Sequence, residues 1–371
     1  MRTKIFNSIL FDPQSDLHLK PVEILIEGDI IAEIAESVDK SADQTIDAKG
    51  AYVSAGWIDI HVHCYYDPNN LGLHADTVGC KTGVVCVCDA GSAGHSNLDD
   101  FYQSVKDQKT IVKSFINIAS TGLAYKAELR DPANVDVAKT IEKIREYPNF
   151  IVGIKVRASA SVMGEDTDTP FIKAREAAKA TNKPIMVHYG NKPPLMEDVL
   201  QYLHRGDILT HCFHGKPNGV LNEDDKIKEL VWTKRKEGLL FDVGHGNESF
   251  SYEKGKKAHD CGFDADMIST DAHRQSFPVP VSSLANVLSK MLEIGYSLEE
   301  VIACVTSRPA QYLDMRDEFG HVSKGGKAHL TFFKVDPTPV TVVDSSRKEI
   351  LLNRQILTQG CMISGEYLEV E

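Results

Sequence analysis

The sequence lacks a long apolar run, a leader-like N-terminus and an excess of basic residues. None of its 371 residues falls in a stretch approaching the roughly 18 apolar residues of a membrane span. Residues 1–7 contain no long apolar core and no small-residue cleavage site, so we expect no secretory signal. The formal net charge is −12, which disfavours nucleic acid or an anionic membrane surface as the main partner. We therefore expect a small-molecule substrate and neither nucleic acid nor a membrane as partner. These observations are compatible with a homo-oligomer.

The eight cysteines do not read as a disulfide framework, because the chain is large and shows no secretion signal. Cys86 and Cys88 alternate within an apolar strand, so both thiols face one side. Buried free cysteine behaves as a small hydrophobe, which favours core filling over metal binding at this pair. We expect a reducing, cytoplasmic location.

The two ends of the chain have a β-rich texture. Residues 22–29 alternate between apolar and polar side chains and end in a Gly-Asp turn. Residues 30–34 follow as a second strand-like run, so the segment predicts a hairpin. Residues 328–335 and 349–352 are also strand-like. We predict a small discontinuous β-sandwich domain from residues 1–53 and 313–371, around a central domain of residues 54–312.

The central domain alternates strand-like and helical segments. Helical spacing of apolar residues predicts helices over 136–147, 171–181 and 196–203. Eight strand-like runs are each followed by a helix or a helix-sized gap, at residues 56–60, 84–88, 111–118, 150–154, 184–187, 208–210, 239–243 and 267–270. This alternation predicts an α/β fold with parallel strands, and the count of eight predicts a closed (β/α)8 TIM barrel.

Five of these runs end in a side chain that can bind a metal. The side chains are His61 with His63, Lys155, His188, His211 and Asp271. The C-terminal ends of the strands of a (β/α)8 barrel converge, and such barrels place their chemistry there. We therefore expect these side chains to meet at one site.

His61 and His63 lie two residues apart on a strand, so both imidazoles point to one face. A lone His-x-His is equally well explained by two buried, hydrogen-bonded histidines. Here two further strand-end histidines follow, and neutral imidazole is the commonest metal ligand in proteins. The combination favours metal binding.

Lys155 ends a strand that should point into the barrel, where a buried ammonium is costly. It is either a solvated side chain at the barrel rim or a lysine that has reacted with carbon dioxide. The resulting carbamate would bridge two metals. His188 and His211 would complete the second metal site, and Asp271 would bind the first metal and act as proton shuttle. Two divalent metals activate a bridging hydroxide and polarise a carbonyl, which is metal-assisted hydrolysis.

Together these residues resemble the amidohydrolase superfamily. The matching motifs include Gly56–His63, Gly153–Lys155, Val187-His188, Thr210-His211, Ser269–His273 and Thr306–Ala310. The resemblance implies a binuclear centre, usually of zinc, with a carboxylated lysine on the fourth strand.

Within that superfamily the chain is most similar to the dihydroorotase-like deacetylases. The residues that carry this similarity are 88–94, Lys155 to Arg157, and Thr270 to His273. True dihydroorotases generally have an arginine two residues after the second histidine of the His-x-His. This chain has Tyr65 there, which counts against dihydroorotate as substrate.

Five further residues are candidates for substrate binding. Arg157 lies two residues beyond Lys155 on the same strand face and could hold a substrate carboxylate, although a rim salt bridge would also explain it. The loop with Gly91 and Ser92 could present N–H groups to substrate, or it could be a tight turn. Tyr189 and His273 closely follow ligand positions, as does His214, and we expect all three near the pocket.

The leading hypothesis is a metal-dependent hydrolase that removes an acyl group, as a deacetylase does, from a small carboxylate-bearing α-hydroxy or α-amino acid. A cyclic amidase of the dihydroorotase or hydantoinase kind is the alternative. Lys155 argues against a mononuclear deaminase, whose sites lack the carboxylated lysine. The filled ligand positions argue against a non-catalytic relative.

Overall fold

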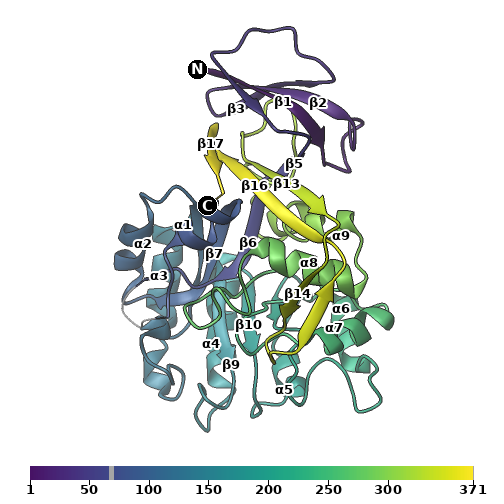
Figure 1. Ribbon diagram of the computed structural model, residues 1–371. Helices are drawn as coiled ribbons and strands as arrows, with labels where there is room; N and C mark the ends of the chain where they lie inside the picture. Colours follow the sequence, from purple (N-terminus) through teal and green to yellow (C-terminus); the bar gives the residue numbers. More distant parts are fainter. Residues whose placement is uncertain (67–70, 371) are drawn as a thin grey trace.

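A curled sheet of seven parallel strands forms the centre of the molecule, with helices packed around it (Figure 1). The computed structural model describes residues 1–66 and 71–370. The sheet follows chain order from β6 to β12: Trp57–Val62, Val84–Gly94, Ile111–Asn117, Ile151–Ala158, Ile185–Tyr189, Ile208–Thr210 and Leu240–Asp242. Strands β6 and β7 are buried along their whole length, which is typical of a parallel sheet covered on both faces.

The eighth predicted strand, residues 267–270, does not form a regular strand. Instead, Met267 makes a parallel bridge to Asp242 at one edge of the sheet, and Ala272 makes a parallel bridge to Val62 at the other. Residues 267–272 therefore span the gap between β12 and β6. The left-handed backbone of Asp271, with φ of 46°, interrupts the extended conformation that a strand needs.

The helices follow the strands of the central sheet. The predicted helices at 136–147 and 171–181 are present as α3 and α4, while the third, α5, ends at Leu200 because residues 201–207 turn towards β11. In chain order the helices α1 to α10 are Ala75–Val78, Leu98–Val105, Val137–Glu146, Thr169–Thr181, Met196–Leu200, Glu229–Glu237, Tyr252–Asp260, Leu284–Ile294, Leu298–Ala303 and Ser307–Tyr312. In the described part of the chain, none of these helices has the length and apolar character for a membrane crossing.

Strands from both ends of the chain share a second sheet, which lies above the barrel-like body in Figure 1. Its order is β17-β16-β13-β5-β1-β2-β3, with β4 paired to β1. The predicted hairpin is present as β2 and β3, which pair antiparallel. The strands are β1 Arg2–Leu10, β2 Pro21–Glu27, β3 Ile30–Ala35, β4 Gln44–Asp47, β5 Tyr52–Ala55, β13 Leu330–Asp336, β16 Gln355–Ile363 and β17 Glu366–Glu369.

A separate hairpin, β14 Val340–Val343 with β15 Glu349–Leu352, lies against the central body and not in the terminal sheet. The hydroxyl of Ser345 at its turn donates to the carbonyls of His245 and Gly246, at 3.1 and 3.0 Å. The C-terminal segment therefore reaches the loop that follows β12.

All eight cysteines are free thiols, and Cys86 and Cys88 are fully buried in an apolar cluster, as predicted.

Candidate metal centre

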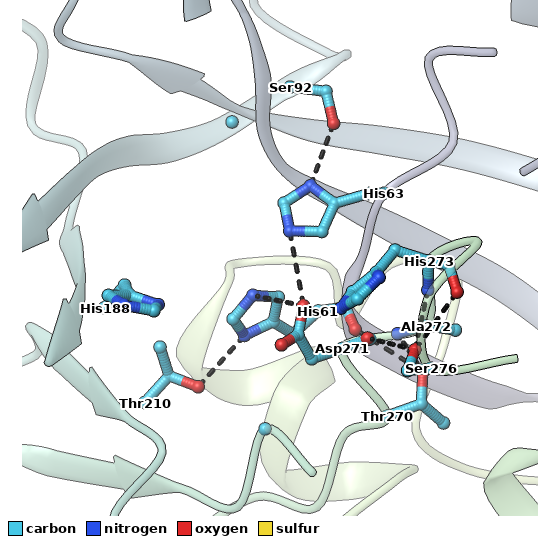
Figure 2. Close-up of polar contacts among 12 residues, drawn as sticks. His61, His63, Ser92, His188, Thr210, Thr270, Asp271, Ala272, His273 and Ser276 are labelled. Carbon is cyan, nitrogen blue, oxygen red and sulfur yellow. Dashed lines mark hydrogen bonds and ion pairs between the residues drawn. The ribbon is translucent and has the colours of Figure 1, made fainter. Parts of the chain in front are cut away.

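Three of the predicted ligands form one compact cluster. One ligand atom each from His61, His211 and Asp271 lies within 4.8 Å of the others. The Nε2 atoms of His61 and His63 lie 3.4 and 3.3 Å from Oδ1 of Asp271. Figure 2 shows His61 and His63 converging on Asp271. The ends of β6 and β11 and the segment 267–272 supply these side chains, so the convergence expected of parallel strand ends is present.

His188 joins the cluster through His211. Nδ1 of His188 lies 2.8 Å from Nε2 of His211, while Nδ1 of His211 lies 2.6 Å from the carbonyl oxygen of Gly244. A carbonyl can only accept, so Nδ1 of His211 carries the proton. Nε2 of His211 is therefore unprotonated, and its lone pair, which here faces Nδ1 of His188, is the one that a metal would use.

A hydroxyl and a carboxylate orient His61 in the same way. The hydroxyl of Thr210 donates to Asp242 at 2.6 Å, so its oxygen is left to accept from Nδ1 of His61 at 2.9 Å. Nε2 of His61 then has a lone pair towards Asp271. Such outer contacts commonly fix the tautomer of a metal-binding histidine. On His63, Nδ1 contacts the hydroxyl of Ser92 at 2.9 Å.

Lys155 lies beside these histidines in a fully buried position. Its Nζ is 3.2 Å from Nε2 of His61 and 3.4 Å from Sδ of Met186. Among the described residues no carboxylate lies within ion-pair distance of Nζ, and burial lowers the pKa of Lys155 to about 7. A substantial part of the amine is therefore neutral near pH 7, and a neutral amine is the form that reacts with carbon dioxide.

The protonation states of the cluster suit a metal site. Burial lowers the pKa of His211 to about 3 and lowers the pKa values of His61 and His188 well below the ordinary range. Burial alone would raise the pKa of Asp271, but the surrounding histidines hold it well below its usual value. Neutral imidazoles and an ionised carboxylate are the metal-binding forms of these groups.

Two of the ligand candidates have a left-handed backbone, which is uncommon for residues with a side chain: φ is 66° at His211 and 46° at Asp271. Gly246 makes room for Asp271, since a Cβ there would overlap Oδ2 of that carboxylate. Gly91, with φ of 85°, plays a similar part for Lys155, because a Cβ at this position would lie 2.6 Å from Cβ of the lysine.

A cavity of about 370 Å³ opens beside the cluster. His63, His188 and Asp271 line it, together with the predicted substrate residues Arg157 and His273. Nδ1 of His273 accepts from the backbone N–H of Gln275 at 3.2 Å, so Nε2 of this ring is left as a donor when the ring is neutral.

Arg157 forms an ion pair with the buried carboxylate of Glu128. Nη1 of Arg157 lies 3.1 and 3.3 Å from the two carboxylate oxygens of Glu128. Burial raises the pKa of Glu128, and the neighbouring guanidinium opposes this rise. The rim salt bridge considered from the sequence is thus present, and it also orients the guanidinium at the edge of the cavity.

Three other predicted substrate residues are not among those that line this cavity. Gly91 packs on Lys155, and Ser92 points its hydroxyl at His63. Tyr189 lies with its ring 5.6 Å from that of His214, and Asn218 donates to its hydroxyl at 2.6 Å. Alternation along a strand explains the last result, because the residue after His188 points to the opposite face.

Four residues of the site were missed from the sequence: Thr210, Glu128, Asp242 and Lys216. Asp242 ends β12, one residue before the end of the predicted strand 239–243, so the strand-end pattern could have found it. Glu128 lies outside regular strands and helices, and only its contact with Arg157 marks it. Lys216 lines the cavity and pairs with Glu248 at 3.4 Å, a contact that depends on two loops meeting.

The cluster fits divalent metal ions. The imidazoles of His61, His188 and His211 are neutral, those of His61 and His211 have an unprotonated Nε2, and the carboxylate of Asp271 is ionised. Nitrogen and oxygen donors of this kind suit zinc and similar ions.

Comparison with known proteins places these observations in a family. Residues 52–353 match the family model described as the Amidohydrolase family. A protein of Enterococcus faecalis named "Deacetylase" is 37% identical over 350 residues, which are 93% of this chain and 95% of that protein. Two solved structures are also similar. One, titled as an adenine deaminase, is 36% identical with a TM-score of 0.94 and covers 99% of both chains. The other, titled as a dihydroorotase, is 31% identical with a TM-score of 0.93 and covers 100% of this chain and 98% of that one.

Proposed function

This chain belongs to the amidohydrolase family and is a hydrolase, and we propose that it removes an acetyl or similar acyl group from a small carboxylate-bearing α-hydroxy or α-amino acid. The observation that supports this most directly is that Arg157 and His273 line the same small cavity as His63, His188 and Asp271. One substrate molecule can then place its acyl group at the cluster and its carboxylate at Arg157. The relatives named deacetylase support the same reaction class.

The proposal includes two divalent metals, with zinc expected, held by His61, His63, His188, His211, Asp271 and a carbamate on Lys155. When bound, they would supply a nucleophile by lowering the pKa of water and would polarise the acyl carbonyl. Formation of the carbamate joins the Lys155 nitrogen to the carbon of carbon dioxide and releases one proton. The buried, partly neutral amine supports this step.

Asp271 is the proposed proton shuttle. Its carboxylate is ionised and lies at the edge of the cavity, so it can accept a proton from the attacking water and deliver it to the leaving oxygen or nitrogen. A positioned proton-transfer group of this kind typically contributes about 10²–10⁴-fold to the rate. The left-handed backbone and the space at Gly246 hold the carboxylate in this position.

The substrate carboxylate is assigned to Arg157. Glu128 already uses Nη1, so the remaining N–H groups of the guanidinium are the ones that face a ligand. The Nε2–H of His273 is a second donor for the same molecule. Lys216 and its ion-pair partner Glu248, 3.4 Å away, both line the cavity, so their charges offset each other and Arg157 supplies the unbalanced positive charge.

A cyclic amidase is the second candidate, because one similar structure is titled as a dihydroorotase. Tyr65 opposes it. This residue is buried, its ring lies 5.0 Å from that of Phe101, and it is not among the residues that line the cavity. True dihydroorotases generally have an arginine at this position, whereas here the side chain points into the core. The similar structure titled as an adenine deaminase makes adenine a third compound to assay.

The test is a substrate comparison with metal-loaded enzyme. Release of acetate is measured from acetylated α-hydroxy acids and N-acetyl amino acids, and turnover of dihydroorotate, hydantoins and adenine is measured in parallel. Acetate release with the highest kcat/KM is the expected result. Turnover of a cyclic amide or of adenine without acetate release would overturn the proposal.

We also infer that residues 267–272 complete a (β/α)8 barrel over residues 54–312, with a small discontinuous β domain from residues 1–53 and 313–371, whose hairpin β14–β15 packs on the barrel and not in the terminal sheet. The parallel bridges at Met267 and Ala272 and the shared terminal sheet support this architecture. The eight free thiols support a reducing, cytoplasmic location.

A further inference from the structure

A second cavity, of about 570 Å³, adjoins the active-site cavity at Lys216, whose side chain lines both. Its walls come mainly from the loop that follows β11, residues 212–223. The reaction proposed above uses no residue that is confined to this second cavity.

His214 lines this cavity and has an unused donor. Its side chain is buried, with 4% of the residue exposed. The backbone N–H of Lys216 donates to Nδ1 of His214 at 3.1 Å, so Nδ1 must be an acceptor. With Nδ1 as acceptor, the one proton of the ring is on Nε2. Nε2 is buried and has no hydrogen-bond partner among the described residues.

Gly219, which also lines the cavity, borders this edge of the ring. A Cβ added there would lie 3.4 and 3.8 Å from Cε1 and Nε2 of His214, so the absence of a side chain at Gly219 limits how tightly this edge is covered. A buried donor without a partner is costly, and native proteins rarely keep one without a reason. An acceptor atom brought by a ligand would remove that cost.

The charges around the cavity indicate what kind of acceptor fits. Four lysines line it, against one glutamate: Lys192, Lys216, Lys228 and Lys254, with Glu223. Three of the lysines are already paired: Lys216 with Glu248 at 3.4 Å, Lys228 with Glu197 at 2.8 Å and Lys254 with Asp225 at 3.0 Å. For Lys192 the described residues supply no ion-pair partner. The lining therefore favours an acceptor that carries negative charge.

We propose that this cavity is a second subsite that binds a carboxylate, with the Nε2–H of His214 as its donor and the lysines around it as counter-charges. Because Lys216 borders both cavities, the expected source is the far end of the substrate itself, which would then be an acylated dicarboxylic acid. This assignment of the source rests on the function proposed above. A separate small carboxylate is the other source of the same chemistry.

Three variants isolate the donor. His214→Asn keeps an acceptor near the Nδ1 position but has no donor that extends as far as the Nε2–H group. His214→Gln places an amide N–H near the Nε2 position and should restore part of the binding. Gly219→Ala narrows the space while leaving the histidine intact, so it tests the site even if the His214 variants fold poorly. The matched control is His204→Asn, on an exposed histidine that is not among the residues that line either cavity.

The first measurement is kcat/KM for acetylated dicarboxylic acids of increasing length, each paired with a counterpart whose distal carboxylate is replaced by methyl. At one chain length the wild type should prefer the dicarboxylic acid by about 10–150-fold, as expected for a hydrogen bond to a charged group. His214→Asn and Gly219→Ala should lose this preference, His214→Gln should keep part of it, and the control should keep all of it. The methyl counterparts should be hydrolysed equally by all variants.

The second measurement separates the two sources. Calorimetric titration of glutarate into the metal-loaded wild type and into His214→Asn tests binding without any turnover. Binding to the wild type that is lost in the variant, with no preference among substrates, assigns the subsite to a separate carboxylate. An unchanged preference in His214→Asn and Gly219→Ala, together with equal glutarate binding, would overturn the subsite. If the wild type releases no acetate from any compound, the proposed function fails, while the titration still decides on the subsite.

Discussion

The Nδ1 atom of His61 lies 2.9 Å from the hydroxyl oxygen of Thr210, and the proton of that hydroxyl points to the buried carboxylate of Asp242. The hydroxyl of Ser269 donates to the same carboxylate oxygen at 2.7 Å. This chain of contacts leaves one tautomer for His61, in which Nε2 has a lone pair towards Asp271. The side chain before His211 on β11 therefore decides the state of a histidine on β6.

Thr210→Val should weaken metal binding while leaving the fold intact. The valine has nearly the same shape but cannot accept from Nδ1, so the unprotonated Nε2 of His61 is no longer selected. Removal of an outer contact of this kind typically costs about 10–100-fold in metal affinity. Metal affinity measured with a competing chelator should fall by that factor. Thr341→Val, at an exposed site on β14, is the control and should change nothing. Equal affinities for both variants would show that Thr210 does not orient His61.

Lys155→Ala should lose most of the bound metal and nearly all activity. The loss should exceed the roughly 10–100-fold of an outer contact, because a direct ligand is removed. A short carboxylic acid added to the variant should restore part of the activity by supplying the missing oxygens. Lys113→Ala is the control, since this lysine lies on the neighbouring strand β8 and donates to the carbonyl of Asn149. A wild-type protein with full activity in carbonate-free buffer, and with an unmodified Lys155 amine, would contradict the carbamate.

Asp271→Asn should keep the fold and most of the metal but lose about 10²–10⁴-fold in kcat, because the amide cannot carry the proton. Since the pKa of Asp271 lies well below its usual range, the wild type should keep its kcat down to pH values below those at which an ordinary aspartate is protonated. The pH profile of kcat and the metal content are measured together. Asp260→Asn, at an exposed site, is the control. A variant within tenfold of wild type would remove Asp271 from the proton-transfer role.

Arg157→Met should lower kcat/KM by roughly 10–150-fold for an acetylated α-hydroxy acid, which corresponds to about 1.5–3 kcal/mol for a charged hydrogen bond. The methyl ester of the same acid should lose much less. The substitution also leaves the buried Glu128 without its ion-pair partner. The double variant Arg157→Met with Glu128→Gln therefore separates the loss of the substrate contact from a disturbed fold. Equal losses on the acid and its ester would reject Arg157 as the carboxylate anchor and favour neutral cyclic amides.

The buried Lys290 should make the stability of the protein rise with pH. Its Nζ contacts Nε2 of His245 at 3.0 Å and the carbonyl of Pro280 at 2.8 Å, and burial lowers its pKa from 10.5 to about 7. Below about pH 7 the amine is protonated in the folded and the unfolded chain alike. Between about pH 7 and 10.5 only the unfolded chain holds the proton, so the folded state gains stability as pH rises, by at most about 1.4 kcal/mol per pH unit.

Urea unfolding of wild type and Lys290→Met at pH 7 and at pH 9.5 measures this contribution. The free energy of unfolding should rise more with pH in the wild type than in the variant. Parallel pH dependences would show that Lys290 titrates near its ordinary value in the folded protein.

Strand-end positions were readable from the sequence because a parallel sheet obeys two local rules. Side chains alternate along a strand, and the carboxyl ends of consecutive parallel strands meet at one edge. These rules were enough to anticipate that His61, His63 and Asp271 converge and that Arg157 lies on the same face as Lys155. The same alternation rule, applied more strictly, would have turned Tyr189 away from the cavity that His188 lines.

The amino-acid sequence by itself therefore determined the alternation of strands and helices, the six candidate ligands and the family resemblance. Only the tertiary structure decided which side chains support them. Thr210 meets His61 across 149 residues of chain, Glu128 meets Arg157 from a segment without regular structure, and the orphan donor of His214 appears only when the loop after β11 closes around it. Such contacts depend on how separate elements pack, and no local pattern of residues encodes that packing.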